Sequence, residues 1–353
     1  MEVFAEKTIS LYGSDVWYTK PVCCLHCQSQ SQKMAVSCLK YNYAFTTIAN
    51  TSISLQAQIM ASRTFQWISS TDPQNKLQLE QLHQRMMQFY ANESTRDGYQ
   101  VLIPTSENTT PADPVSIAFL HWFQQQQFSN IIEVGCGNGR TFNYLQHLMA
   151  NATYTGIEVD EQSITRNQQR WPHQRWIQSD AYTLPVPEES ADLIFSMYVL
   201  EHLVYPKKAL DLMYQKLKPG GILALVFPDF TCTKRLPSQQ LGLSLLQSAK
   251  QKFQKLKLID AFISLYDSKI RLQKALKEIT KQPGMFMVNT APNCLVADNK
   301  QVWPDYDAVY IAHKMEIAHW ATQHNASIDF PMGKGKPFDE HSFIIIEKQP
   351  END

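Results

Sequence analysis

Short apolar runs alternate with amphipathic stretches in the middle of the chain. The runs that predict strands are 131–134, 154–159, 176–179, 192–197 and 222–227, and the stretches that predict helices between them are 140–150, 161–170 and 207–217. Such alternation is typical of βαβ units, in which helices connect parallel strands. The pattern therefore predicts an α/β fold built on a mostly parallel sheet.

Helical periodicity dominates the flanking segments. Apolar residues recur at helical spacing in 76–91, in 115–127 and along 238–281, where they predict two or three helices. Sheet-like runs follow at 285–288, 309–311 and 342–347, with a helix at 314–324. Residues 1–75 scatter aromatic and β-branched residues that predict short strands or irregular structure, and the proline-rich stretch 105–114 predicts a loop.

Composition narrows the class of protein. The 353 residues are 44% hydrophobic and 18% charged, which is an ordinary globular balance. The N-terminus lacks the basic region and apolar run of a signal peptide, and no stretch approaches the roughly 18 apolar residues of a membrane span. We therefore expect a soluble, cytoplasmic protein. A net charge of -1 gives no overall positive field that would favour a nucleic acid or a membrane as partner.

A glycine-rich loop comes after the first strand of the alternating region. The strand ends at Glu133 and Val134, and Gly135-Cys136-Gly137-Asn138-Gly139 leads into the next helix. Glycines let the chain turn tightly and approach a ligand closely, and the start of the helix presents free N–H groups to it. Such a loop by itself is weak support for a ligand site, so its meaning depends on the motifs that the later strands carry.

Further motifs occur at regular intervals along the chain. Glu158 ends the second strand, about twenty residues beyond the loop, where dinucleotide-type folds place the acid that binds ribose hydroxyls. Asp180-Ala181 comes after the third strand, and Ser196 lies near the end of the fourth. A Lys218-Pro219-Gly220-Gly221 turn precedes the last strand of the series.

Together these motifs resemble class I S-adenosylmethionine-dependent methyltransferases, particularly the type 11 and ubiquinone-pathway group. The resemblance covers roughly residues 128–230 and implies a Rossmann-like, doubly wound, mostly parallel seven-stranded sheet. It implies S-adenosylmethionine as the cofactor, bound by Glu133, Gly135, Gly137, Asn138, Gly139, Glu158, Asp180, Ala181 and Ser196. A nicotinamide cofactor is disfavoured because its fingerprint needs Gly or Ala where Arg140 stands.

The changes of pattern divide the chain into four predicted parts. They are an N-terminal extension (1–112), a Rossmann-like cofactor-binding core (113–230), a helical insertion (231–284) and C-terminal strands and helix that complete the sheet (285–353). We expect the extension and the insertion to form the lid and the acceptor-recognition region.

Catalytic candidates lie just after the fourth strand. The resembling ubiquinone-pathway enzymes carry Glu-x-x-Glu-His here, an arrangement associated with a divalent metal. Tyr198 stands in place of the first acid while Glu201 and His202 are retained, so we expect no metal. His202 is the candidate general base for a hydroxyl acceptor, and Tyr198 the candidate acceptor-pocket residue. The alternative is that Glu201 and His202 only anchor the start of a helix.

Two clusters leave alternatives open. Cys24 and Cys27, with Cys23, His26 and Cys38 nearby, could contribute to a zinc site, but the second pair of a structural zinc site is missing, and ordinary thiols are favoured. Residues 250–281 carry nine Lys or Arg against three acids. This basic segment could contact RNA phosphates, although a solvated helix face is the more common meaning.

The function that these observations favour is methyl transfer to an oxygen or nitrogen of a small molecule, such as a metabolite, a glycan precursor or a natural product. An RNA-modifying methyltransferase, using the basic segment, is the alternative among enzymes. A non-catalytic cofactor-binding module is the alternative of another class. The intact glycines together with both ligand acids favour the enzyme.

Overall fold

The computed structural model describes residues 7–11, 14–18, 64–92, 95, 98, 114–245, 247–296, 303–331 and 340–350. The chain divides into two compact units, Met1–Thr64 and Phe65–Asp353. In the first unit, β1 (Lys7–Leu11) pairs antiparallel with β2 (Ser14–Tyr18), so short strands do occur in the N-terminal segment. The cysteine cluster around Cys24 and Cys27 and the proline-rich stretch 105–113 lie outside the described residues.

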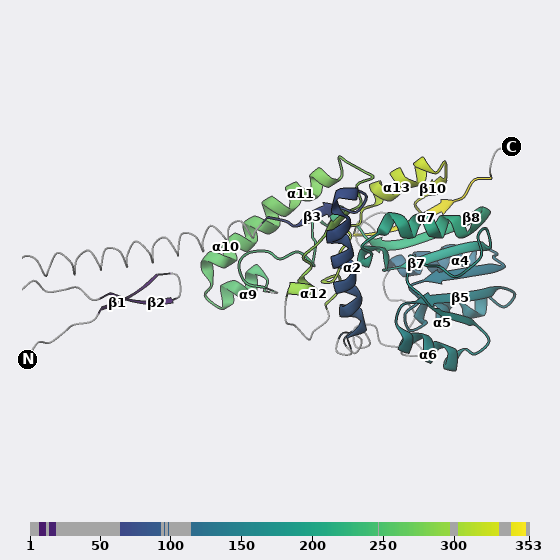
Figure 1. Cartoon of the computed structure of the whole chain (residues 1–353), viewed down its shortest axis with the longest axis horizontal. Helices are drawn as coiled ribbons and strands as arrows, with labels where there is room; N and C mark the ends of the chain where they lie inside the picture. Colours follow the sequence, from purple (N-terminus) through teal and green to yellow (C-terminus); the bar gives the residue numbers. More distant parts are fainter. Residues whose placement is uncertain are drawn as a thin grey trace, which may run out of the picture. The chain divides into compact units, whose positions relative to one another are not determined.

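A seven-stranded sheet in the order β10-β11-β8-β7-β4-β5-β6 forms the centre of the second unit (Figure 1). The strands are β4 (Asn130–Val134), β5 (Thr153–Glu158), β6 (Arg175–Gln178), β7 (Ala191–Met197), β8 (Leu217–Pro228), β10 (Ser327–Asp329) and β11 (His341–Glu347). The pairs from β6 to β8 are parallel, whereas β11 runs antiparallel to both β8 and β10. The predicted mostly parallel, seven-stranded α/β sheet is confirmed.

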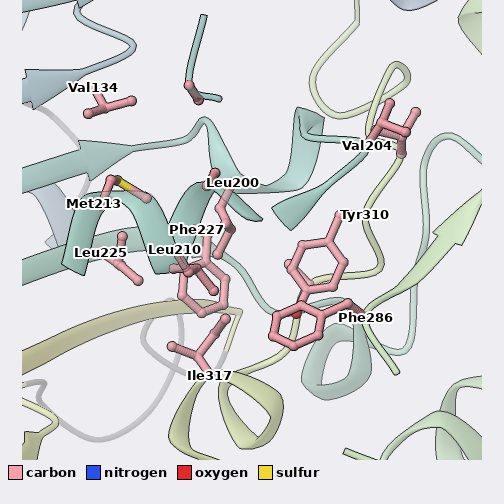
Figure 2. Packing of buried hydrophobic residues seen from close by; sticks show 14 of the residues in the cluster. Val134, Leu200, Val204, Leu210, Met213, Leu225, Phe227, Phe286, Tyr310 and Ile317 are labelled. Carbon is pink, nitrogen blue, oxygen red and sulfur yellow. The ribbon is translucent and has the colours of Figure 1, made fainter. Parts of the chain in front are cut away.

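Helices cover both faces of the sheet, because neighbouring residues of the central strands enter two different cores. On β8, Leu223, Leu225 and Phe227 enter one core and Ala224 and Val226 the other. The second core receives α4 (Pro114–Gln124), α5 (Arg140–Leu145) and α6 (Glu161–Arg170), and the first receives α2 (Lys76–Ala91), α7 (Pro206–Lys216) and α13 (Lys314–Gln323). Figure 2 shows part of the first core, where Phe227 lies beside Leu210 of α7 and Ile317 of α13. This is the doubly wound arrangement that the sequence predicts.

The helical insertion holds α8 (Phe230–Thr233), α9 (Ala249–Gln254), α10 (Leu258–Tyr266) and α11 (Leu272–Ile279). A single π-helical turn, η4 (Asp267–Arg271), joins α10 to α11. Figure 1 shows α9, α10 and α11 (green) gathered together, away from the strands of the sheet. The predicted helices are present from residue 249 onward. Residues 238–245 are not helical, because Gly242 has a φ of +76° and the N–H groups of Leu243 and Ser244 donate to Asp260.

Two predicted strands near the C-terminus differ from the structure. β9 (Met287–Asn289) does not join the main sheet but pairs with β3 (Trp67–Ser69) in a sheet of two strands. Residues 309–311 form only a single bridge, at Tyr310, because the N–H groups of Val309 and Tyr310 donate to the carbonyl of Glu201. That pair of hydrogen bonds ties this segment to residues 200–202, which come shortly after β7, where the candidate site lies.

The remaining short elements are η1 (Pro73–Asn75), η2 (Gln146–Leu148), η3 (Leu200–His202) and α12 (Asn293–Val296). The predicted helix 140–150 therefore ends early, at Leu145, and continues as η2. Among the described residues, every helix is too short or too polar to cross a bilayer.

Candidate active site

The carboxyl ends of β4, β5, β6 and β7 meet at one edge of the sheet, which is where open α/β sheets bind ligands. A cavity of about 620 Å³ opens at this edge. Among the predicted site residues, the cavity is lined by Glu133, Gly135, Gly137, Asn138, Glu158, Asp180, Ala181, Tyr198 and His202. Gly139 and Ser196 are not part of its lining.

The glycines of the loop meet different requirements, although Gly135, Gly137 and Gly139 all have positive φ. A Cβ on Gly135 would lie 2.2 Å from a methyl carbon of Val199, and one on Gly139 would lie 2.4 Å from the ring of Trp171. A Cβ on Gly137 would meet no atom within 4 Å and would project into open space. Gly135 and Gly139 are therefore packing positions, whereas Gly137 leaves room for a ligand close to the backbone.

Glu158, at the end of β5, holds the glycine loop in place. Its carboxylate accepts N–H groups from Gly137 at 2.9 Å, from Val159 at 2.8 Å and from Asp160 at 3.2 Å. Burial raises the pKa of Glu158, and these three hydrogen bonds oppose that rise. A carboxylate offers about four acceptor sites, so one remains for a ligand hydroxyl.

Asp180, after β6, stabilises its own turn. One carboxylate oxygen accepts the N–H of Tyr182 at 2.9 Å and the hydroxyl of Thr183 at 2.7 Å. The hydroxyl of Tyr182 in turn accepts the N–H groups of Val204 and Tyr205, beyond β7. These bonds connect two of the loops that line the cavity.

Glu133 contributes a buried acid to the cavity. It is 2% exposed, and burial raises its pKa to about 8 although the hydroxyl of Tyr154 donates to it. A buried carboxyl group with a raised pKa gains a favourable interaction when a cationic group of a ligand comes near. The part of the cavity next to Glu133 therefore suits a positively charged group of a ligand.

Ser196 and Gly139 lie behind the cavity lining. Ser196 is 3% exposed within β7, between strands β4 and β8. Gly139 begins α5 and packs against Trp171. Their predicted contact with the cofactor stays a prediction. In this structure the two residues support the residues that line the cavity.

Tyr198 lies directly after β7 in a strained backbone conformation. Its φ is +58°, its N–H donates to the carbonyl of Val226 at 2.7 Å, and its ring meets that of His341 edge-on with centroids 5.7 Å apart. Strain of this kind is concentrated at functional sites, where the surrounding structure maintains it. The turn places Tyr198 in the cavity wall.

His202, in η3, lies between two carboxylates. Its Nδ1 is 3.2 Å from Oδ2 of Asp307, and its Nε2 is 3.8 Å from Oε1 of Glu201. Burial would lower the pKa of His202, but the charge and hydrogen bond of Asp307, with the charge of Glu201, raise it to about 10. Tyr90 of α2 donates its hydroxyl to the same Asp307 oxygen at 2.9 Å. The neighbouring carboxylates thus favour the imidazolium form of His202.

Glu201 belongs to the same group. Its side chain is fully buried, and burial raises its pKa to about 8 even though His202 favours the charged form. Its backbone carbonyl receives the two N–H groups of the 309–310 segment. The Glu201-His202 pair therefore anchors that segment, and His202 also faces the cavity.

Sequence reasoning missed part of the cavity wall. Helix α2 contributes His83, Met86, Met87 and Tyr90, and Asp307 stands behind His202. The helical pattern of 76–91 could have pointed to α2 as a packed element, but no pattern marks Asp307. No described residue of the insertion 231–284 lines the cavity, so its expected part in the acceptor pocket stays a prediction.

Part of the chain is similar to known proteins. Residues 132–225 match a family model described as a methyltransferase domain. A trans-aconitate 2-methyltransferase of Delftia acidovorans is 32% identical over 105 residues, which are 29% of this chain and 39% of that protein. A phthiotriol/phenolphthiotriol dimycocerosates methyltransferase of Mycobacterium tuberculosis is 28% identical over 93 residues, covering 26% of this chain and 34% of that protein.

Among solved structures, a methyltransferase of Thermotoga maritima, described as a possible histamine N-methyltransferase, is similar at a TM-score of 0.38 with 14% identity. That similarity covers 67% of this chain and 89% of the other. The chain thus spans less than half the length of the curated relatives named above.

Proposed function

Residues 132–225 form a class I methyltransferase domain with S-adenosylmethionine as its cofactor, and from this premise we propose that the chain transfers a methyl group to an oxygen or nitrogen of a small molecule. One observation carries the proposal. A single cavity joins the glycine loop to a largely apolar wall from α2, which leaves space for an acceptor beside the cofactor.

The residues at the strand ends suit this cofactor. Gly137 leaves open space at its α-carbon, as close backbone approach requires. Glu158 and Asp180 offer carboxylate oxygens to hydroxyl and amino groups, and Glu133 offers a buried acid to a cationic group. We propose that these four residues hold the cofactor, with Asn138 and Ala181 beside them.

The bound cofactor supplies a methyl group that its sulfonium already activates, so the chain mainly has to hold the acceptor close and in line. Positioning of this kind contributes roughly 7–11 kcal/mol in favourable cases. Met86 and Met87 of α2 would exclude water from the acceptor, and Tyr90 and Tyr198 would orient it. No covalent nucleophile is needed, and Cys136 is buried inside the loop.

His202 is the proposed general base for a hydroxyl acceptor. An imidazolium cannot accept a proton, so this role requires the neutral form, which the pair with Asp307 disfavours at pH 7. The base would therefore act mainly at alkaline pH. If His202 only anchors the 309–310 segment, the rate follows from positioning alone.

The RNA alternative has less support than the basic composition of residues 250–281 implies. Lys252 is fully buried and paired with Asp260 at 2.9 Å, and Arg271 is paired with Asp267 at 2.8 Å. The expectation that Lys252 forms part of an exposed cationic face was wrong. The side chain is taken inside because buried Asp260 and Ser264 need its charge and its N–H donors.

An acceptor screen with labelled cofactor tests the proposal. The full chain is incubated with fractionated metabolites and, in parallel, with total RNA, and Gly137→Val serves as the control that cannot bind cofactor. We expect label in a small-molecule fraction only, and none with the variant. Label in RNA would favour the alternative, and cofactor binding without transfer to any fraction would favour a non-catalytic module.

A further inference from the structure

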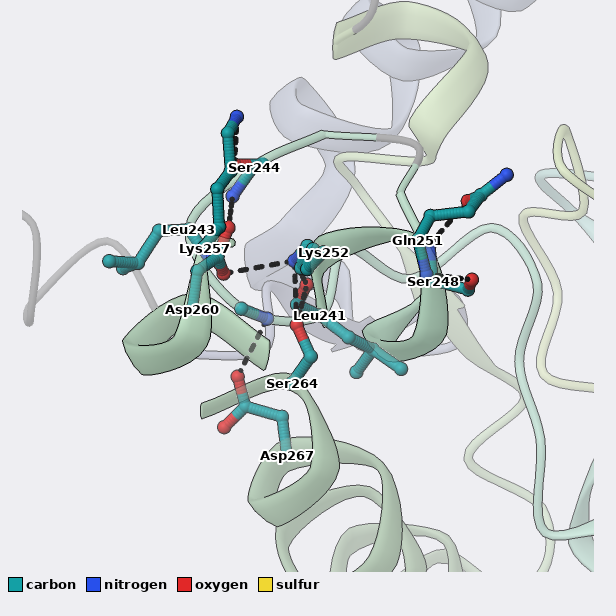
Figure 3. Close-up of polar contacts among 11 residues, drawn as sticks. Leu241, Leu243, Ser244, Ser248, Gln251, Lys252, Lys257, Asp260, Ser264 and Asp267 are labelled. Carbon is teal, nitrogen blue, oxygen red and sulfur yellow. Dashed lines mark hydrogen bonds and ion pairs between the residues drawn. The ribbon is translucent and has the colours of Figure 1, made fainter. Parts of the chain in front are cut away.

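The hairpin of α9 and α10 has a polar interior. Nζ of Lys252 lies 2.9 Å from Oδ1 of Asp260, 2.6 Å from Oγ of Ser264 and 2.8 Å from the carbonyl of Leu241. Asp267 accepts the N–H of Gly242 at 2.9 Å in the same interior (Figure 3). A buried charge is tolerated only when it is paired and hydrogen-bonded, as here. This network fixes which side of α10 faces inward.

The outward side of the hairpin is apolar. Six large apolar side chains are at least half exposed, from 50% for Leu258 to 83% for Leu256, and the others are Ile259, Phe262, Tyr266 and Ile270. Leu258, Phe262 and Tyr266 of α10 recur every four residues, with Ile259 beside them and Ile270 one turn further on η4, and they form one stripe opposite Asp260 and Ser264. We call these six residues the hairpin face. Exposed apolar patches of this kind mark interaction sites.

The loop before α10 adds a strained apolar residue to this face. Leu256 has a φ of +58°, a conformation that is unfavourable for a residue with a Cβ. It is also the most exposed residue of the hairpin face. Backbone strain that presents a leucine to the outside is consistent with a contact made there.

Positive charge surrounds the hairpin face. Lys250, Lys255, Lys257 and Lys269 are exposed, whereas both acids between residues 247 and 271, Asp260 and Asp267, are buried in the polar interior. The outer surface of this segment is therefore apolar and cationic without an exposed acid. Apolar residues flanked by lysines are the pattern of helices that lie in the interface of an anionic bilayer.

We propose that the hairpin face docks the protein on an anionic membrane surface, with Phe262 and Leu256 entering the headgroup boundary and the lysines contacting lipid phosphates. This is surface contact rather than a membrane span, and it does not depend on the proposed methyl transfer. RNA would engage the lysines and stack a base on Phe262, but it would leave the exposed aliphatic side chains of Leu256, Leu258 and Ile259 without a partner. A symmetric second copy would bring the lysines of two chains together, which charge repulsion opposes.

Vesicle flotation of the full chain tests the docking. The probes are vesicles of phosphatidylcholine mixed with phosphatidylglycerol and vesicles of phosphatidylcholine alone. We expect binding to the mixed vesicles only. Phe262→Ser should weaken it about tenfold or more, because the burial of one such side chain is lost. The matched control is Met315→Ser, which removes a 57% exposed apolar side chain from α13 and should bind as the unaltered chain does.

Charge reversal and oligomeric state complete the test. Lys255→Glu should weaken binding at least about fivefold, since each lysine near such a surface contributes on the order of a factor of five, and should reduce its salt dependence. Failure of the unaltered chain to float with mixed vesicles overturns the proposal, as does equal loss with Met315→Ser. A dimer in solution that Phe262→Ser dissociates would assign the face to a second copy instead, and RNA binding that Lys255→Glu abolishes, in a chain that does not float with mixed vesicles, would assign the segment to RNA.

Discussion

Gly137 and Gly135 should respond differently to the same added side chain. Gly137→Val places its side chain in open space at the cavity, so it should cost only the backbone strain, about 1–2 kcal/mol, yet abolish cofactor binding. Gly135→Ala forces a Cβ against Val199 and should lower both the unfolding temperature and the cofactor affinity. Thermal unfolding with calorimetric titration separates the two. Normal binding by Gly137→Val would mean that the site is elsewhere.

Glu158 should have a measurable part in cofactor affinity. Glu158→Ala removes the acceptor of three backbone N–H groups and the proposed partner of a ligand hydroxyl, so binding should weaken by about 1–3 kcal/mol. Calorimetry with S-adenosylmethionine and S-adenosylhomocysteine measures the loss, and NAD should show no binding. Glu161→Ala is a control in the first turn of α6, because Glu161 is exposed and does not line the cavity. An unchanged affinity in Glu158→Ala would remove this residue from the site.

The pKa of His202 gives the pH dependence a definite sign. If neutral His202 is the base, the rate should rise with pH through an inflection well above 7, and His202→Ala should lower turnover roughly 100-fold or more and abolish the inflection. Asp307→Asn removes the negative charge that raises the pKa, so the inflection should move to lower pH. Cofactor affinity should hardly change in either variant. A rate that is flat with pH in both would leave positioning as the source of catalysis.

The same ion pair also contributes to stability, with the opposite trend in pH. A histidine whose pKa is raised on folding stabilises the native state fully below its unfolded pKa of about 6.5 and loses that contribution as pH rises through about 10. Denaturant unfolding of the unaltered chain should therefore show stability falling over this interval. His202→Ala should remove that part of the fall.

Single residues show how far the sequence could predict the site. The acids and glycines at the ends of β4, β5 and β6 could be found because their motifs lie at regular intervals along the chain. Asp307 and Tyr90 could not, since each reaches His202 from a segment more than one hundred residues away in sequence. The pKa of His202 depends on that tertiary contact, and so the predicted base could not be assigned its protonation state.

Helices and strands were predictable where a single periodicity of hydrophobic residues extended over the whole element. Helix α2 has the bounds that its stripe predicts, and the strands of the parallel sheet fall within one residue of their apolar runs, except that β8 begins at Leu217 and so includes the predicted turn at 218–221. The 309–311 run looks like a strand but gives its N–H groups to Glu201. In α10 the apolar spacing predicted a helix, and the helix is present, but its large apolar side chains are exposed and a polar network occupies the interior. Periodicity shows that a helix has two sides without showing which side is inside.

The polar interior of the α9–α10 hairpin should be essential for the stability of that segment. Lys252→Met leaves Asp260 buried without its partner, a change that typically costs about 3–5 kcal/mol. Lys255→Met, on the exposed side of the same helix end, should cost almost nothing. Hydrogen exchange of residues 249–271 locates the effect, which should be faster exchange there with the sheet unchanged. Equal protection in both variants would contradict the role given to the network.

For the whole second unit, cofactor binding should stabilise two elements that lie far apart in sequence. The cavity is lined both by the glycine loop and by α2, so a bound ligand contacts both. Ligand at about 100 times its dissociation constant stabilises the folded state by about 2.7 kcal/mol. We expect added protection from hydrogen exchange in residues 76–91 and 133–139, and no change in α10. Protection of the loop alone would mean that α2 does not close over the ligand.

The sequence resemblance to class I methyltransferases is confirmed, together with the cofactor and the α/β fold that it implies. It covers the part of the chain where short motifs recur in a set order. The rest of the cavity wall includes α2, with Asp307 behind His202, and no such motif exists in either segment. The proposed acceptor would contact these segments, and because they carry no motif, its identity could not be predicted from the sequence.

The labelling rate of the Cys136 thiol can report how often the glycine loop opens. Its thiol is 4% exposed, lies against the backbone of Gly156, and has a pKa that burial raises well above the ordinary value. An alkylating reagent needs an exposed thiolate, so Cys136 can react only when the loop lifts away from β5. Cys232 is exposed and would record the reagent's activity in the same sample. The ratio of the two labelling rates would therefore time the opening of the loop, and a ligand that closes it would slow only the first.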